Sequence, residues 1–194
     1  PERLLEEKAG RRPPGAAPEG CAPCPGAILT YPLSERKNRF VSIHEECGVF
    51  GVLDPAGDCA RTTYYGLFAL QHRGQESCGI AAIRDREMSF HKDLGLVGEV
   101  FSPEILDRLG GTMAVGHVRY PPTGGSRREN AQPLTLKYVK GTLALAHNGN
   151  LVNAGQLRTA FEYRGAIFQT TTDSELIAYA IAQERLRCGS AEEA

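Results

Sequence analysis

The sequence lacks the features that would place the chain in a membrane or on a nucleic acid. No apolar run approaches the roughly 18–20 residues that span a bilayer, and the N-terminal stretch PERLLEEKAGRRPPG has no apolar core of a secretory signal. The formal net charge of −1 gives no electrostatic reason to expect a nucleic acid or an anionic membrane as a partner. What remains is a composition typical of a globular protein, in a chain of 194 residues that suffices for one domain with a substantial core.

Cysteine is scarce and irregularly spaced, with six in the chain: Cys21, Cys24, Cys47, Cys59, Cys78 and Cys188. This pattern favours a cytosolic protein with reduced thiols over a disulfide framework. Cys21 and Cys24 have the spacing of a metal or redox pair, but no second pair accompanies them, so we expect no such site there. Each cysteine is otherwise a buried hydrophobe or a chemical group, and burial is the more frequent state.

The first 46 residues are expected to form a flexible leader. Residues 10–26 contain five prolines and four glycines, a composition typical of disorder. The chain begins with Pro1 rather than Met, so we expect it to be trimmed or a fragment. Order is predicted to begin near Cys47 and to continue as one domain over residues 47–194.

Within that domain, short strands and helices follow one another. Turn-like segments separate the strands more often than helices do, which favours an α+β fold in which helices cover antiparallel sheets. Ser102, Pro103 and Gly110 are expected to cap, start and stop one short helix. The predicted strands lie within 41–54, 78–85, 86–95 (the weakest pattern), 113–120 and 142–149, and the predicted helices within 60–74, 102–111, 153–165 and 170–186.

Cys47 stands in the stretch EECGVFG, at the start of a predicted strand. The neighbouring Glu45 and Glu46 carry the wrong charge to favour a thiolate, so a buried packing role is one reading. Cleavage between Glu46 and Cys47 would instead give Cys47 its own α-amino group. Such a group has a pKa of about 8 and can serve as a general base beside the thiol. Sequence spacing alone leaves both readings open.

The segment HNGN, residues 147–150, follows an apolar strand. Asn-Gly is the strongest hairpin-turn dipeptide, so a plain turn is one interpretation. The other is an oxyanion hole, because the Asn148 side-chain amide and the Gly149 N–H are two donors of the kind that acyl transfer requires.

Arg119 and Asp173 are two further candidates. Arg119 ends the strand GHVRY and could form a structural ion pair or clamp a substrate carboxylate. Asp173 could cap the last helix or pair with a substrate ammonium. Together they would match both ends of a free α-amino acid. His72 and Arg73 at a helix end are read as structural, and TGGSR lacks the Lys-Ser/Thr of a phosphate-binding loop.

Taken together, the segments resemble the class II glutamine amidotransferases. The resemblance covers about residues 44–185, and its segments are specific as an ordered set rather than singly. Within the family, the chain looks most like the branch that transfers ammonia to phosphoribosyl pyrophosphate in purine synthesis. The matching segments are ECGVFGV, TYYGLFALQHRGQES, GHVRY, NAQPL, LAHNGNLVNA and TDSE.

This resemblance implies an N-terminal-nucleophile hydrolase fold, a four-layer α/β/β/α sandwich with two antiparallel sheets. It implies that Cys47 is the nucleophile, with its freed α-amine as general base, and that Asn148 and Gly149 form the oxyanion hole. Arg119 would bind the carboxylate of the substrate glutamine, and Asp173 its amine. A leader ending in Glu-Glu is removed in one branch of the family, although 46 residues is long for such a leader.

The same resemblance implies partners and cofactors of a longer enzyme. A phosphoribosyltransferase domain, absent from this chain, would bind Mg²⁺, and the leader-bearing branch carries a 4Fe–4S cluster. We expect no cofactor in the chain itself, no nucleic-acid or membrane partner, and a homo-oligomer.

Two departures from the family pattern concern packing and glutamine binding. Pro121 and Pro122 follow GHVRY where the family has a small residue and then Thr, which here is Thr123. Cys78 replaces a small residue, which we expect to be a packing change. Two alternatives remain: a glutaminase domain that serves another acceptor, or an unprocessed, non-catalytic interaction module.

Overall fold

The structure, a computed structural model, describes residues 47–120 and 127–190. Its larger sheet has four strands: β1 (Gly48–Leu53), β2 (Ser77–Arg84), β3 (Glu87–Leu94) and β4 (Met113–Arg119). Their order is β1-β4-β2-β3, and every neighbouring pair is antiparallel. The central pair, β4 and β2, places Ser77 opposite Arg119. The end of β4 therefore lies beside the start of β2.

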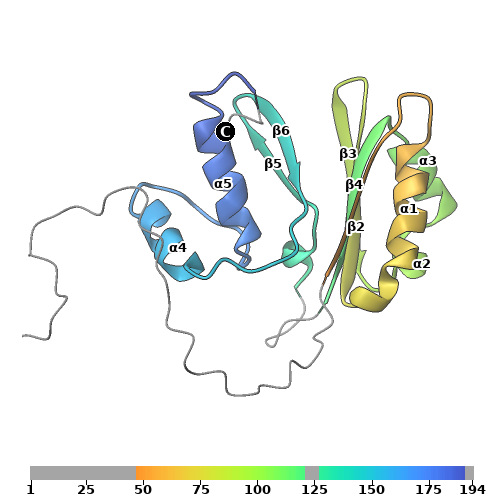
Figure 1. The fold of residues 1–194 in the computed structure, drawn as a ribbon, viewed down its shortest axis with the longest axis horizontal. Coiled ribbons are helices and arrows are strands. Elements are labelled where there is room, and N and C mark those ends of the chain that lie inside the picture. The colour runs from red at the N-terminus through yellow and green to blue at the C-terminus, as the bar shows by residue number, and fades with distance from the viewer. Residues whose placement is uncertain (1–46, 121–126, 191–194) are drawn as a thin grey trace, which may run out of the picture. The chain divides into compact units, whose positions relative to one another are not determined.

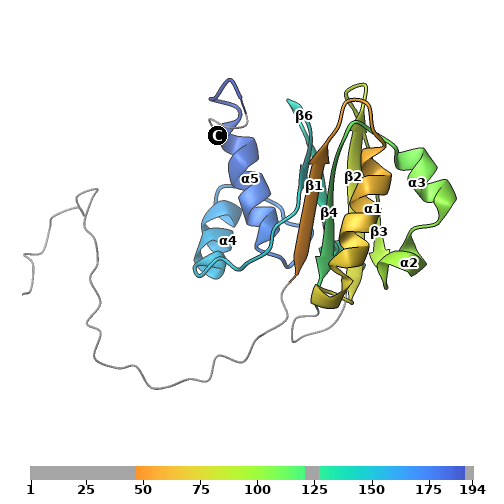
Figure 2. The same ribbon diagram turned by 45° about the vertical axis from the view of Figure 1, so that its right-hand side comes forward.

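One face of this sheet is covered by helices, as Figures 1 and 2 show. They are α1 (Cys59–Ala69), α2 (Val97–Val100) and α3 (Pro103–Leu109). Alternate residues of the strands point to this face and join the helices in one core cluster, as expected from the two-residue period of a strand. Members of the cluster include Leu67, Cys78, Ile80, Ala114 and Val118.

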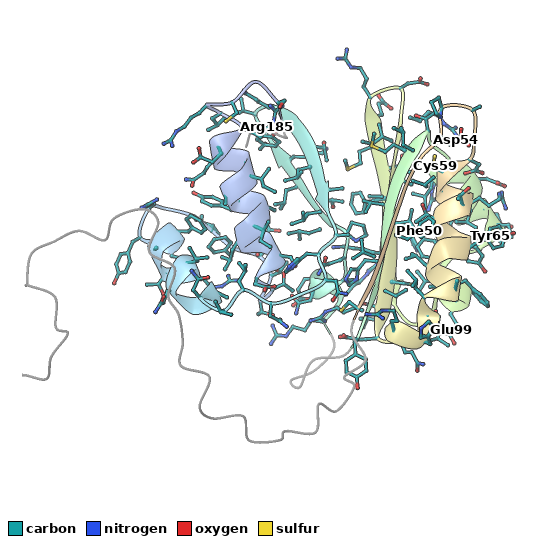
Figure 3. The ribbon with its side chains drawn as sticks, viewed as in Figure 1. Phe50, Asp54, Cys59, Tyr65, Glu99 and Arg185 are labelled. Carbon is teal, nitrogen blue, oxygen red and sulfur yellow. The ribbon has the colours of Figure 1, made fainter. Side chains whose placement is uncertain are left out.

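Helix α1 lies close to β1 at one position. A Cβ added to Gly66 would come within 2.5 Å of the Phe50 ring, so only glycine lets the helix backbone approach this side chain. Figure 3 shows Phe50 between the sheet and α1, whereas Tyr65 points away from the sheet. Asp58 caps the helix, since its carboxylate accepts a hydrogen bond from the Arg61 N–H at 3.1 Å.

The caps predicted for the short helix are confirmed in α3. The Ser102 hydroxyl accepts a hydrogen bond from the Ile105 N–H, Pro103 occupies the first position, and Gly110 follows the last turn with φ of 49°. Helix α1 is shorter than predicted: it ends at Ala69, and a 3₁₀ turn, η1 (Gln71–Arg73), follows. That turn directs Arg73 toward Cys47.

The second sheet consists of β5 (Leu134–Tyr138) and β6 (Gly141–Leu145), paired antiparallel. A short 3₁₀ turn, η2 (Arg128–Asn130), precedes β5. Helices α4 (Ala154–Glu162) and α5 (Ser174–Glu184) follow β6 in the chain, and α5 packs against both β5 and β6. The mixed α+β class with two antiparallel sheets is therefore confirmed. None of the helices in the described ranges is long and apolar enough to cross a bilayer.

Besides α1, three elements differ from the prediction. Strand β5 and helix α2 were not predicted, and α5 begins at Ser174 instead of near residue 170. The late start has a clear cause in Glu175. Its carboxylate accepts hydrogen bonds from the backbone N–H groups of Gln169 and Thr170 and from the Thr170 hydroxyl, which holds this stretch in a loop.

Candidate active site

Three segments of the chain converge on Cys47, which immediately precedes β1. The Tyr120 N–H donates a hydrogen bond to its Sγ at 3.4 Å. Its carbonyl oxygen accepts hydrogen bonds from Asn148 Nδ2 at 2.8 Å and from Arg73 Nε at 3.3 Å. The thiol is half-buried. Residues that are up to 101 positions apart thus meet at this one cysteine.

Arg119 lies beside this cluster, as the last residue of β4. Its Nη1 donates to both carboxylate oxygens of Glu76 at 3.0 Å, and the two side chains are only 11% and 2% exposed. The structural ion pair that we considered for Arg119 is therefore present. Its Nε and Nη2 make no hydrogen bond with any described residue, which leaves donors of the guanidinium for a ligand.

The turn at residues 147–150 follows β6. Gly149 adopts φ of 145°, a conformation that L side chains rarely adopt, and a Cβ there would lie 3.2 Å from His147 Nε2. The Asn148 amide reaches Cys47, whereas no described residue accepts a hydrogen bond from the Gly149 N–H. Of the two predicted donors, the Asn148 amide contacts Cys47, and the Gly149 N–H has no acceptor among the described residues.

Asp173 does not cap α5 with its side chain, although it directly precedes the helix. Instead, Oδ2 accepts a hydrogen bond from the Leu151 N–H at 2.6 Å, and Oδ1 lies 4.0 Å from His147 Nδ1. The carboxylate therefore belongs to the same region as the turn at residues 147–150. Its side chain is 15% exposed, so a ligand can still reach it.

His117 and Gln132 lie behind that turn, and both are buried. His117 Nε2 lies 3.2 Å from the His147 carbonyl oxygen, and Gln132 Oε1 accepts a hydrogen bond from the His147 N–H at 2.7 Å. Burial lowers the pKa of His117 to about 4, so its imidazole is neutral near neutral pH.

The other described cysteines have different surroundings. Cys59 and Cys78 are buried in the core, and burial raises the pKa of the Cys78 thiol to about 12. A packing role for Cys78 is confirmed. Cys21, Cys24 and the stretch Pro121 to Thr123 lie outside the described residues. Within the described ranges, no group of three or more His, Cys, Asp or Glu could hold a metal ion.

Sequence reasoning missed five residues of this site: Arg73, Glu76, His117, Tyr120 and Gln132. Arg73 was interpreted as a cation at a helix end, and the other four were given no role. Arg73 and Glu76 lie within TYYGLFALQHRGQES, His117 and Tyr120 within GHVRY, and Gln132 within NAQPL, three of the segments that carry the resemblance. Their position within those segments was the signal in the sequence that could have marked them as residues of the site.

The chain is similar to several known proteins. A family model described as a glutamine amidotransferase domain matches residues 123–191. The chain is 57% identical over 141 residues to an amidophosphoribosyltransferase from Synechocystis, which is 72% of this chain and 28% of that protein. It is 49% identical over 140 residues to the amidophosphoribosyltransferase of Bacillus subtilis, covering 29% of its length. The chain thus spans less than a third of the curated relatives it matches.

Solved structures give the same result. The glutamine phosphoribosylpyrophosphate amidotransferase of B. subtilis, in complex with ADP and GMP, superposes with a TM-score of 0.64 at 45% identity over 73% of this chain and 30% of that one. A structure described as the allosteric regulatory enzyme of purine biosynthesis superposes with a TM-score of 0.66 at 47% identity. The chain therefore contains a glutamine amidotransferase domain. More particularly, it is the N-terminal amidotransferase domain of the amidophosphoribosyltransferase family.

Proposed function

We propose that this domain hydrolyses glutamine through a thioester on Cys47 and supplies the released ammonia to a phosphoribosyl acceptor. The observation that carries the proposal is the environment of Cys47. The Tyr120 N–H points at its sulfur, and the Asn148 amide lies against its carbonyl. In a domain of this family, these two contacts favour a nucleophilic role for Cys47 over a packing role.

The reaction requires cleavage of the peptide bond between Glu46 and Cys47, so that Cys47 becomes the first residue. The α-amine then accepts the thiol proton, and the sulfur attacks the δ-carbonyl carbon of glutamine. Collapse of the tetrahedral intermediate breaks the carbon–nitrogen bond, and the α-ammonium returns the proton to the leaving ammonia. Water then attacks the thioester, which releases glutamate and restores the thiol.

Asn148 and Gly149 would stabilise the oxyanion of that intermediate. The Asn148 amide already lies beside Cys47, and the Gly149 N–H has no described acceptor. Each such donor is worth roughly 3–4 kcal/mol in the transition state.

Arg119 and Asp173 would hold the two ends of glutamine. The Glu76 carboxylate occupies only Nη1 of Arg119, so Nε and Nη2 remain for a substrate carboxylate. Asp173 engages Leu151 through Oδ2, which leaves Oδ1 for the substrate ammonium. The pair is suited to an unmodified amino acid rather than to a glutamine residue within a peptide.

The rest of the reaction belongs to the longer proteins of this family. Related proteins are named for phosphoribosyl pyrophosphate and for purine biosynthesis. We therefore propose phosphoribosyl pyrophosphate as the acceptor and phosphoribosylamine as the product. Mg²⁺, a 4Fe–4S cluster, the phosphoribosyltransferase domain and homo-oligomer formation are assigned to the longer protein. The four-layer N-terminal-nucleophile arrangement is part of the same proposal.

Steady-state glutaminase assays on the mature, Cys47-led protein test the proposal. We expect glutamate and ammonia to form in equal amounts, and the Cys47→Ser variant to lose the activity. Cys59→Ser is the matched control, because Cys59 is buried in α1 and should keep the activity. Equal activity of the Cys47→Ser variant and the unmodified protein would contradict a thioester on Cys47.

A further inference from the structure

The peptide groups of His147 are held from two sides by buried side chains. Its N–H donates to Gln132 Oε1 at 2.7 Å, and its carbonyl oxygen lies 3.2 Å from His117 Nε2. His117 is fully buried in β4, and Gln132, just before β5, is 6% exposed. Both backbone hydrogen-bonding groups of the residue that precedes Asn148 are thus fixed by side chains from other segments.

The geometry determines which nitrogen of His117 carries the proton. A carbonyl oxygen can only accept, so Nε2 must donate, and Nδ1 is then the unprotonated nitrogen. Nδ1 is buried and has no partner among the described residues. The neutral Nε2–H tautomer agrees with a pKa that burial lowers. His117 is therefore a fixed neutral donor whose described polar contact is the His147 carbonyl.

Gln132 is fixed at both ends of its amide. While Oε1 accepts from His147, Nε2 donates to Ser174 Oγ at 3.1 Å. Ser174 Oγ also lies 3.3 Å from His147 Nδ1, so Gln132, His147 and Ser174 form a closed ring of hydrogen bonds. This ring connects the turn to the start of α5, where Asp173 is the preceding residue. The two candidate binding regions therefore share one buried polar network.

We propose that His117 and Gln132 are positioning residues that fix the Asn148–Gly149 turn in the orientation of an oxyanion hole. This inference rests on the proposed function of that turn. Both side chains are bonded to the backbone of His147, so they act through it rather than on the substrate. An oxyanion donor contributes only when it is correctly placed, and a displacement of about 1 Å can cost about 100-fold in rate.

Steady-state kinetics of the mature protein, which begins at Cys47, separates a role in positioning the turn from a role in binding glutamine. In His117→Phe and Gln132→Met we expect kcat to fall about 10–100-fold while KM for glutamine changes less than about threefold. His117→Gln can place an amide donor near the position of Nε2 and should regain most of the rate. Leu106→Ala is the control, because it destabilises the core from α3 without removing a contact of the turn. It should leave both constants near their original values.

Amide hydrogen exchange of His147, whose N–H donates to Gln132 Oε1, gives a second readout that does not depend on activity. We expect at least about tenfold faster exchange there in His117→Phe and Gln132→Met, with strand β2 unchanged. If His117→Phe does not fold, Gln132→Met and His117→Gln carry the test. Unchanged exchange at His147, or a kcat within twofold of the original in Gln132→Met, overturns the proposal. If the unsubstituted mature protein is inactive, the proposed function fails, and hydrogen exchange still decides whether the two residues hold the turn.

Discussion

The buried imidazole of His117 predicts a specific loss of stability in acid. Burial, which is the main cause, and the nearby charges of Arg119 and His147 lower its pKa from 6.5 to about 4, against an opposing hydrogen bond to the His147 carbonyl. Between these two values the unfolded chain binds a proton that the folded chain does not. Stability contributed by the neutral imidazole is therefore fully present above pH 6.5 and is lost as the pH falls toward 4.

The size of this effect follows from the two pKa values. With 6.5 for the unfolded chain and about 4 for the folded one, lowering the pH from 7 to 5 removes about 2 kcal/mol of unfolding free energy through this one group. Other groups that titrate in this range contribute too, so the comparison needs a variant without the imidazole. His117→Gln keeps a donor at the same place and does not titrate.

Urea denaturation at pH 7 and pH 5 measures the difference. The unsubstituted protein should lose about 2 kcal/mol more than His117→Gln over this interval. Equal losses in the two proteins, within about 0.5 kcal/mol, would contradict a lowered pKa for His117 in the folded protein. So would an NMR titration of His117 in the folded protein with a midpoint near that of an exposed histidine.

Three further substitutions test the site and its support. Glu76→Ala leaves the Arg119 guanidinium buried without its partner, so we expect the free energy of unfolding in urea to fall by about 3–5 kcal/mol. The double variant Glu76→Ala with Arg119→Ala should recover part of that loss. Asn148→Gly should lower kcat for glutamine hydrolysis about 100–1,000-fold with little change in KM; an unchanged kcat would exclude Asn148 from the oxyanion hole. Glu175→Ala removes the acceptor that holds the loop before α5. Thermal unfolding should therefore show a free energy of unfolding that is about 2–3 kcal/mol lower.

Local signals in the sequence predicted the regular elements that carry their own start and stop residues. Ser102, Pro103 and Gly110 delimit α3 as expected, because a cap is a contact within one turn of chain. Strand β5 was missed although its five residues alternate apolar and polar side chains, the two-residue period of a half-buried strand. Helix α2 is only four residues long and has no side-chain cap at its start.

The site was predictable only as a set of matching segments. Nothing local in HNGN or EECGVFG indicates that Asn148 and Cys47 lie together, since 101 positions separate them. The Glu76–Arg119 pair depends on strand register, because Ser77 stands opposite Arg119 in the sheet. Such contacts between distant residues are decided by how strands pair, and the sequence pattern does not contain that pairing.

Intact-mass spectrometry shows whether Cys47 forms a thioester with glutamine. Mature protein beginning at Cys47 is mixed with glutamine, quenched in acid within its first turnover, and weighed. We expect a covalent adduct of one glutamyl group, located on Cys47 by peptide mapping and absent from Cys47→Ala. Glutamine hydrolysis without any such adduct, or an adduct on another cysteine, would contradict the formation of that thioester.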